Sequence, residues 1–384
     1  MFRTRGARRR CTLAVLTATV VLATMATTAT TVATTAGAVA VSPAVESAAD
    51  RAVAWLVTQQ QPDGGFEVAG FPGFETSDAV FAIADAAQTT PVWSTAEARA
   101  AVEALHAGGP GGPTPLDALD VWVAGGISAG DAAKLILLVV VPLGLDPHDV
   151  GTSHTDLAAM VYPTGCSGSA DLGAATFYGS LTMGLAGDLL CGSPDPTDVT
   201  RIRAAQRSDG SWSYTGDPAE PTDNGDEVDV TSIATQVLVA AGATVADPAV
   251  RRALAYLASQ QYPSGAFDAF GQPDPNSTAM AMLAVAAVGF DPASSCWRDT
   301  VAPERSGAGY TDPTIWLLTQ QLPDGRVQSP NDGYGVNTYP TSQTVEGWLQ
   351  REVPVVRAGG APDCAPVPVP VPVPDPDPDP RFTG

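Results

Sequence analysis

The segment Arg51-Ala-Val-Ala-Trp-Leu-Val-Thr-Gln-Gln-Gln-Pro-Asp-Gly-Gly-Phe66 recurs later in the chain as Arg252-Ala-Leu-Ala-Tyr-Leu-Ala-Ser-Gln-Gln-Tyr-Pro-Ser-Gly-Ala-Phe267. Nine of the sixteen aligned positions are identical. Parts of the pattern return at Ile315 to Gly325 and at Gln206 to Trp212. A motif that returns in this way indicates a fold built from similar structural units stacked side by side.

The spacing of the motif predicts the number of units. Its glutamines, Gln60, Gln206, Gln261 and Gln321, are separated by 146, 55 and 60 residues. If the first gap holds two degenerate copies, its three steps average about 49 residues (146/3) and match the others. The gap does contain two helical stretches that end at glycine loops, at residues 96–106 and 155–161. We therefore expect six helical hairpins.

A second and more apolar helical run follows each glycine turn. We expect these runs at residues 76–87, 129–145, 174–190, 228–242, 276–288 and 340–349. A helix that is apolar all round must be buried on every side, so these helices form an inner ring and the amphipathic first helices an outer ring. Side-chain oxygens in the first turns of the inner helices predict capping, at residues 76–78, Ser128 with Asp131, residues 277–278 and residues 341–342.

The order of residue types that the repeats share resembles the QW motif of prenyltransferase and squalene-oxidase repeat proteins. These proteins belong to the terpenoid cyclase and protein prenyltransferase superfamily. The segments starting at Arg51 and Arg252 fit this motif throughout, with phenylalanine for the final tryptophan. The resemblance covers about residues 45–352. It implies an all-α fold, an (α/α)6 toroid or barrel of six helical hairpins around a central cavity. It leaves the function open, because cyclases, prenyltransferase subunits, thioester domains and cobalamin carriers share this fold.

The two ends of the chain differ in composition from the repeats. Residues 1–40 contain five arginines, an apolar stretch and a terminal Ala-Val-Ala, which together predict an export signal peptide. Residues 353–384 form a linker and a disordered Pro-rich tail, where alternating prolines predict an extended rod. We expect a secreted or cell-envelope protein whose mature chain has no membrane span.

Four cysteines follow the predicted signal peptide, and an even number in an oxidising compartment indicates two disulfides. Cys296 follows the fifth inner helix and Cys364 the sixth, so we expect these two to pair. Cys166 and Cys191 lie at opposite ends of an inner helix, about 25 Å apart unless the intervening loop folds back. Their pairing therefore stays open.

The charge and the residue composition of the chain argue against several classes of partner and cofactor. The chain has 19 basic and 41 acidic residues and a net charge of −22, so it repels nucleic acid and anionic membranes. Lys134 is its only lysine, and only three histidines occur. No cysteine and histidine share a metal-ligand spacing, so we expect no metal and no cofactor.

One acidic residue resembles the catalytic acid of class II cyclases. These enzymes protonate a polyene with the middle carboxylic acid of an Asp-x-Asp-Asp-Thr-Ala element, and the resemblance places Asp229 at that position, within Glu227-Val-Asp-Val-Thr-Ser232. Val230 replaces the neighbouring aspartate, and strong acidity is hard to arrange without that carboxylate. Asp229 is therefore either the proton donor of a cyclase-like enzyme or a carboxylate at a helix start.

The favoured interpretation is an exported, non-catalytic protein whose cavity or its mouth binds a small molecule or a peptide segment. An (α/α)6 glycosidase or lyase ranks last, because it lacks the QW repeat. Lys134 either pairs with Asp131 one turn earlier or binds an anionic group of the ligand. Acidic residues at the inner-helix starts complement the helix dipoles and form an acidic rim. The candidate ligand-binding residues are Lys134, Asp78, Asp131, Glu227, Tyr334, Asn337 and Tyr339.

Overall fold

The computed structural model describes residues 41–68, 74–166, 176–221, 225–305, 309–331 and 335–351. The chain divides into two units, Met1–Thr35 and Ala36–Gly384, and every described residue belongs to the second. The predicted signal peptide and the linker and tail from residue 353 lie outside the described residues, so their boundaries remain predictions. Within the described part of the chain, no helix is long and apolar enough to cross a membrane.

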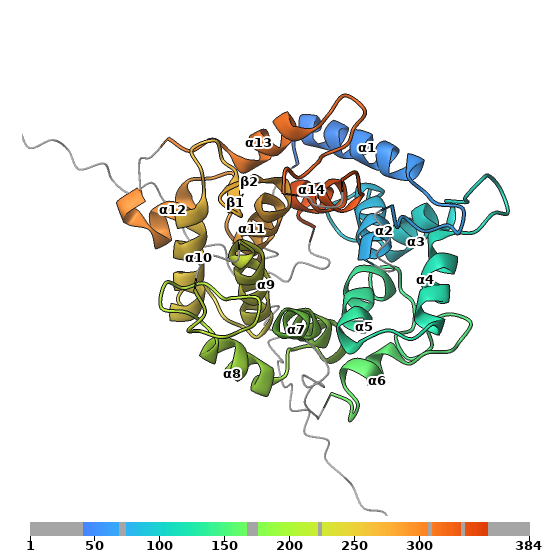
Figure 1. The fold of residues 1–384 in the computed structure, drawn as a ribbon, viewed down its shortest axis with the longest axis horizontal. Coiled ribbons are helices and arrows are strands. Elements are labelled where there is room, and N and C mark those ends of the chain that lie inside the picture. Colours follow the sequence, from blue (N-terminus) through green and yellow to red (C-terminus); the bar gives the residue numbers. More distant parts are fainter. Residues whose placement is uncertain are drawn as a thin grey trace, which may run out of the picture. The chain divides into compact units, whose positions relative to one another are not determined.

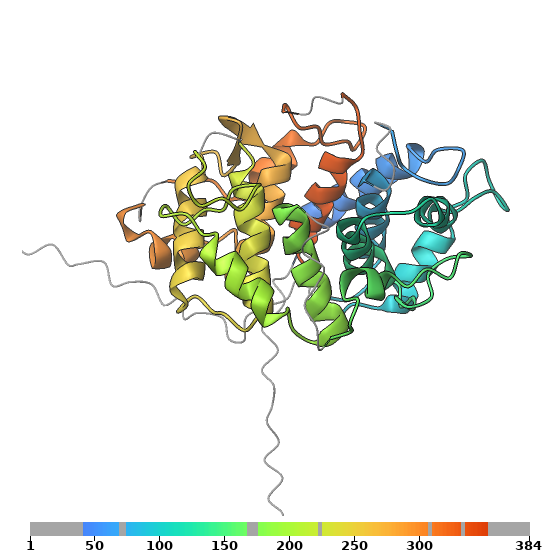
Figure 2. The same ribbon diagram turned by 60° about the horizontal axis from the view of Figure 1, so that its bottom comes forward.

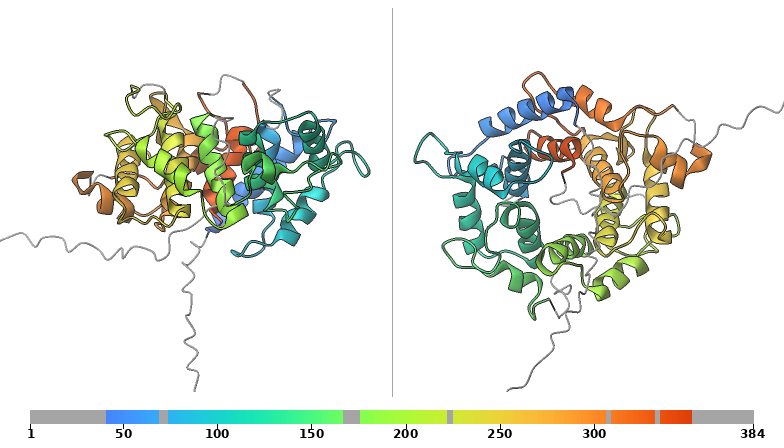
Figure 3. Two further views of the ribbon diagram at one scale, coloured as in Figure 1. Left: turned by 90° about the horizontal axis from the view of Figure 1, so that it is seen from below. Right: turned by 180° about the vertical axis from the view of Figure 1, so that it is seen from behind.

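The helices form two concentric rings (Figure 1), which the view from behind also shows (Figure 3). The inner ring consists of α2 (Phe74–Ala86), α5 (Ala129–Leu135) with the π-helical η1 (Ile136–Val140), α7 (Phe177–Cys191), α9 (Glu227–Ala240), α11 (Pro275–Ala287) and α14 (Tyr339–Leu349). The outer elements are α1 (Pro43–Thr58), α3 (Thr95–Glu103), α4 (Pro115–Ala124), α6 (Leu157–Val161), α8 (Pro196–Ala204), α10 (Pro248–Gln260), α12 (Cys296–Val301), the 3-10 helix η3 (Pro303–Arg305) and α13 (Pro313–Gln320). This arrangement confirms the predicted α/α toroid.

The number of outer helices in the second repeat differs from the prediction. The outer part of the second repeat contains both α3 and α4, whereas the sequence analysis expected one helix at residues 96–106. The start of α4 was readable, since Thr114 and Asp117 form a capping box around Pro115. A short antiparallel hairpin, β1 (Phe267–Ala269) and β2 (Gln272–Asp274), precedes α11.

The repeated motif builds the same turn in four places. The amide nitrogens of Gln60, Gln206, Gln261 and Gln321 each donate to the carbonyl oxygen of the glycine four residues later, at 2.9–3.0 Å. The aromatic residue after the turn is fully buried in three copies, as Phe66, Trp212 and Phe267. The glutamine therefore satisfies a backbone group of the turn.

The threonines at the starts of the inner helices have a role that differs from the predicted capping. Thr76, Thr231, Thr278 and Thr341 accept hydrogen bonds through Oγ1 from the backbone nitrogens of Phe66, Trp212, Phe267 and Val327, at 2.8–3.1 Å. Each bond joins the end of a glycine turn to the inner helix that follows. Capping of α11 comes instead from Asp274, which accepts from the first backbone amides of that helix.

Small residues let neighbouring inner helices approach closely, and the helices lie side by side around the ring when it is tilted (Figure 2). A Cβ added at Gly347 of α14 would lie 2.8 Å from the Cα of Ala279 in α11. The inner helices are not almost wholly apolar, however. Buried charged side chains occur in α2 and α14, namely Glu75, Asp78, Asp85 and Glu346. A buried charge is costly unless it is paired, so these carboxyl groups are candidates for a functional site inside the ring.

The ring closes where the last repeat meets the first helix. Gln321 donates through Nε2 to the carbonyl of Ala48 in α1 (2.8 Å), and its Oε1 accepts from Arg51 (2.5 Å). Gly325 has φ +97°, and a Cβ there would lie 2.2 Å from the carbonyl oxygen of Arg51. Gln321 and Gly325 of the motif thus stabilise the contact between the last repeat and α1 as well as their own turn.

We expect Gln321→Ala to lower the free energy of unfolding by about 2 kcal/mol, because it removes hydrogen bonds that join the two ends of the ring. Urea unfolding followed by circular dichroism measures this loss. The matched control is Gln320→Ala, whose amide donates only to the neighbouring Thr319 hydroxyl (2.9 Å) and which should change stability little. Equal losses for both variants would contradict a role of Gln321 in ring closure.

A disulfide joins Cys166 to Cys191, with their Cα atoms 5.5 Å apart. Cys191 ends α7, so Cys166, which precedes this helix in the sequence, lies beside the end of the helix and not beside its start. Cys296 is also disulfide-bonded. Its predicted partner Cys364 lies outside the described residues, so that pairing remains a prediction.

Replacing both Cys166 and Cys191 with serine should lower the free energy of unfolding by about 3 kcal/mol, the loop-closure value for a separation of 25 residues. The reason is that the unlinked unfolded chain gains conformational entropy. The midpoint of urea unfolding reports the change. An unchanged midpoint would mean that this bond contributes nothing to the stability of the ring.

Candidate functional site

A central cavity of about 450 Å³ lies inside the inner ring and is bordered by residues of all six inner helices in the described part of the chain. First-turn residues of α2, α5, α7 and α14 line it, so the starts of these helices share one end of the ring. Most of its wall is apolar, with Leu137, Leu138, Leu185, Ile233, Met280 and Leu283. Such a cavity with a few polar groups has the usual form of a small-molecule site.

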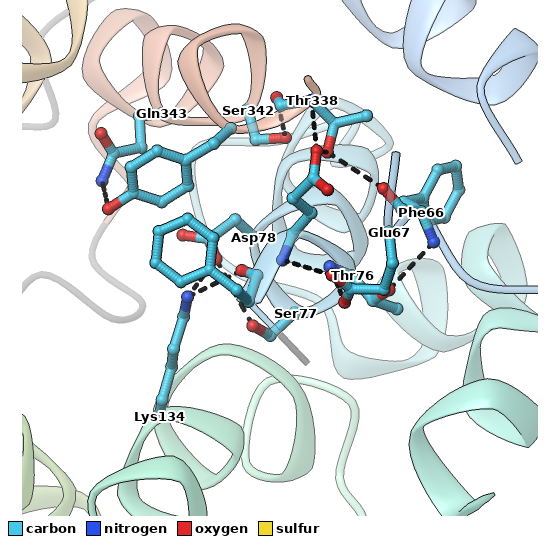
Figure 4. Close-up of polar contacts among 12 residues, drawn as sticks. Phe66, Glu67, Thr76, Ser77, Asp78, Lys134, Thr338, Ser342 and Gln343 are labelled. Carbon is cyan, nitrogen blue, oxygen red and sulfur yellow. Dashed lines mark hydrogen bonds and ion pairs between the residues drawn. The ribbon is translucent and has the colours of Figure 1, made fainter. Parts of the chain in front are cut away.

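An ion pair stands at one side of this cavity (Figure 4). Nζ of Lys134 lies 2.5 Å from Oδ2 of Asp78 and donates to the carbonyl oxygen of Phe74 (2.9 Å). The same nitrogen lies 4.6 Å from the ring centre of Phe74 and 5.6 Å from that of Tyr339. Burial raises the pKa of Asp78, and attraction by Lys134 opposes this rise. The predicted pairing of Lys134 with Asp131 is wrong, because a partner on another helix comes closer.

Two further polar residues of the cavity lie on α14. Glu346 and Gln343 are 7% and 5% exposed, and Oε1 of each has no hydrogen-bond partner among the described residues. Nε2 of Gln343 donates to the hydroxyl of Tyr339 (2.7 Å). Burial raises the pKa of Glu346 well above its usual value, and the negative charges of Asp78 and Asp85 add to the rise.

The sequence analysis missed Glu346 and Gln343, although a signal was present. Lys134 lies inside the expected inner helix at residues 129–145, and Glu346 is likewise a charged residue inside the expected inner helix at residues 340–349. The cavity also contains Tyr178 of α7 and Gln236 of α9. Burial raises the pKa of the Tyr178 hydroxyl, and nearby carboxylates, Asp229 first, raise it further.

No protein-family model and no curated protein sequence matches this chain. Among solved structures, a variant of the type II terpene cyclase MstE from Scytonema, in complex with geranylgeranyl dihydroxybenzoate, has a TM-score of 0.50 at 15% sequence identity. The match covers 80% of this chain and 97% of the cyclase. The chain has the α/α-toroid fold. At this identity the likeness concerns the fold alone.

Two other solved structures match over similar lengths. A protein from Actinoplanes is 18% identical over 80% of this chain and 99% of its own, with a TM-score of 0.47. A glycosidase in complex with glucose is 13% identical over 81% of this chain and 97% of its own, with a TM-score of 0.45.

The toroid brings four of the predicted ligand-binding residues to its cavity: Lys134, Asp78, Asp131 and Tyr339. Asp131 also forms a capping box with Ser128, so its carboxylate already accepts from the start of α5. Tyr339 opens α14, and its ring lies 4.6 Å from that of Phe74. The side chains of Phe74 and Tyr339 both line the cavity beside Lys134.

Two other predicted residues, Glu227 and Asn337, do not line the cavity. Glu227 is ion-paired with Arg207 at 3.3 Å, and both side chains are buried. Asn337 is buried and accepts through Oδ1 from the backbone nitrogen of Tyr339 (3.0 Å). Tyr334 lies outside the described residues. Glu227 and Asn337 therefore have structural contacts of their own, and the predicted acidic rim is smaller than expected.

Asp229, the predicted alternative acid, lies in the first turn of α9 and is not among the residues that line the cavity. Burial raises its pKa to about 7, and a hydrogen bond with the Ser277 side chain opposes this rise. Its Oδ1 has no hydrogen-bond partner among the described residues. Asp229 is thus a weakly acidic carboxyl group on an inner-ring helix, and it does not line the described cavity.

No metal site was expected from the sequence. Over the described ranges, no group of three or more histidine, cysteine, aspartate or glutamate side chains is arranged to hold a metal ion. Of the carboxyl groups that line the cavity, Asp78 is paired with Lys134 and Asp131 takes part in the capping of α5. Burial raises the pKa of the third, Glu346.

Proposed function

We propose that this protein is an exported, non-catalytic binding protein whose toroid cavity holds a small, largely apolar molecule. The observation that carries this proposal is the composition of the cavity, with leucine, isoleucine and methionine on most of its wall and ionisable groups gathered on α2, α5 and α14. Its volume of about 450 Å³ lies within the range of small-molecule sites. The disulfide between Cys166 and Cys191 is consistent with an oxidising compartment outside the cytoplasm.

The test is recovery of a bound molecule from an extract of the producing cells. Purified protein is incubated with the extract, washed and analysed by mass spectrometry. Leu185→Trp fills part of the cavity, and Leu322→Trp adds the same side chain at a position 37% exposed. We expect one compound with the wild type and with Leu322→Trp, and its loss with Leu185→Trp. Recovery of the same compound from all three proteins would reject binding in the cavity.

A cyclase-like enzyme that uses Asp229 as proton donor is the second candidate. The raised pKa of Asp229, about 7, favours it, since a protonated carboxyl is what such a step requires. Its position off the cavity wall disfavours it. We expect no cyclised product when the wild type is incubated with squalene or a geranylgeranyl substrate. A product that disappears in Asp229→Asn would establish the enzyme.

A further inference from the structure

We propose that the cavity selects ligands that carry a protonated amine, which the side chains of Glu346 and Gln343 bind. This inference rests on the proposed ligand-binding function and names the chemical class of the ligand. The ligand would combine a compact apolar body with one ammonium group.

Gln343 and Glu346, whose Oε1 atoms have no hydrogen-bond partner among the described residues, lie on the same side of α14. Gln343 and Glu346 are three residues apart on α14, so they are neighbours on the same helix face, and both line the cavity. The Gln343 amide nitrogen donates to the Tyr339 hydroxyl at 2.7 Å and to the Met280 sulfur at 3.6 Å. These contacts fix the amide, so that its oxygen is left as an acceptor. A buried acceptor without a donor is costly, and a donor on a ligand removes that cost.

Charge favours a cationic donor over a neutral one. Three charged groups act on Glu346: Asp78 and Asp85 from α2, and Lys134 from α5. Asp78 is paired with Lys134, and Asp85 with Arg351 at 2.9 Å. Among the described residues no ion pair involves Glu346, although it is buried like the other two carboxyls. A ligand ammonium would complete the third pair.

The remaining groups around the site fit the same ligand. Tyr178 and Tyr339 are the other titratable side chains of the wall near α14, and their rings can stabilise a cation. The charge of Lys134 is already balanced by Asp78, and Lys134 also donates to the Phe74 carbonyl, so an anionic ligand would find no unpaired positive charge there. The apolar wall from α5, α9 and α11 would enclose the body of the ligand.

Binding should release a proton. Burial and the carboxylates of α2 raise the pKa of Glu346, which favours the neutral acid over the carboxylate in the empty site. When an ammonium ion enters, the Glu346 proton leaves to solvent and a carboxylate–ammonium pair remains. Affinity for the amine should therefore rise as the pH rises, by up to about tenfold per pH unit, until Glu346 is ionised without a ligand.

The test is calorimetry with three probes that share one apolar cage: 1-adamantanamine, 1-adamantanol and 1-adamantanecarboxylate. With the wild type at pH 8 we expect the amine to bind at least about tenfold more tightly than the alcohol. The amine should bind more weakly at pH 6, and buffers of different ionisation enthalpy should reveal the released proton.

Variants separate Glu346 from the rest of the cavity. Glu346→Gln keeps the shape of the neutral acid, so the fold should survive; it should weaken amine binding about tenfold, abolish the pH dependence and leave the alcohol unaffected. The matched control Gln236→Met alters another polar residue of the wall and should preserve the preference for the amine.

Three outcomes would overturn the inference. Equal binding of amine and alcohol, or tightest binding of the carboxylate, would reject amine selection while supporting a ligand-binding cavity. Binding of none of the probes would reject amine selection for this cavity, and the extract experiment would then judge the proposed function independently.

Discussion

Asp78→Ala should destabilise the protein by about 4 kcal/mol, because it leaves the Lys134 ammonium without its counter-ion at a site where the lysine side chain is only 22% exposed. The remaining contacts of Lys134, the Phe74 carbonyl and two aromatic faces, carry no negative charge to replace the carboxylate. Urea unfolding of the purified variant at neutral pH measures the loss.

A double-mutant cycle separates this loss from the lost packing of Asp78. Lys134→Met removes the charge and keeps most of the apolar stem, and it should cost about 2 kcal/mol. The variant with both substitutions should be more stable than Asp78→Ala alone, since no unpaired charge then remains. Additive losses would show that the two side chains do not interact in solution.

Much of the fold was predictable because the motif encodes local chemistry. A glutamine that bonds the glycine carbonyl four residues later, followed by a buried aromatic, ends the outer helices α1, α8 and α10 in the same way. The inner helices α2, α9, α11 and α14 accordingly begin and end within about two residues of their expected limits. The sequence analysis does not predict α4, because it takes the glycines at residues 108–112 as the turn that leads to the next inner helix. The capping box at Thr114 is the local signal for the start of α4.

The site was less predictable, because its contacts join helices that are distant in sequence. Spacing along one helix suggested Asp131 as the partner of Lys134, yet Asp131 serves its own helix start and Asp78 comes from α2. In the same way the carboxylate of Glu227 meets Arg207 from the preceding loop. Sequence spacing identifies partners within a helix, whereas the choice among carboxylates across the ring depends on how the helices are rotated.

Asp229→Asn should stabilise the protein above neutral pH, and this second large effect also bears on the choice of function. The pKa of Asp229 is about 7 in the folded protein against an ordinary value of 3.8. Below about pH 4 the carboxyl is protonated in both states and contributes no difference. As the pH rises from about 4 to about 7, only the unfolded chain loses the proton, so this carboxyl lowers stability progressively, by up to about 4 kcal/mol.

Asparagine resembles the neutral acid at every pH, so the stability of Asp229→Asn should match that of the wild type near pH 4 and exceed it at pH 8. Urea unfolding across this range measures the difference, and the exposed Asp50→Asn of α1 is the control that removes a charge without removing a buried carboxyl. A difference that does not change with pH would mean that Asp229 is ionised in the fold at neutral pH. It would then have no proton to give, and the cyclase-like alternative would lose its acid. A difference that grows with pH would establish the protonated carboxyl, which that reaction requires but which burial alone also explains.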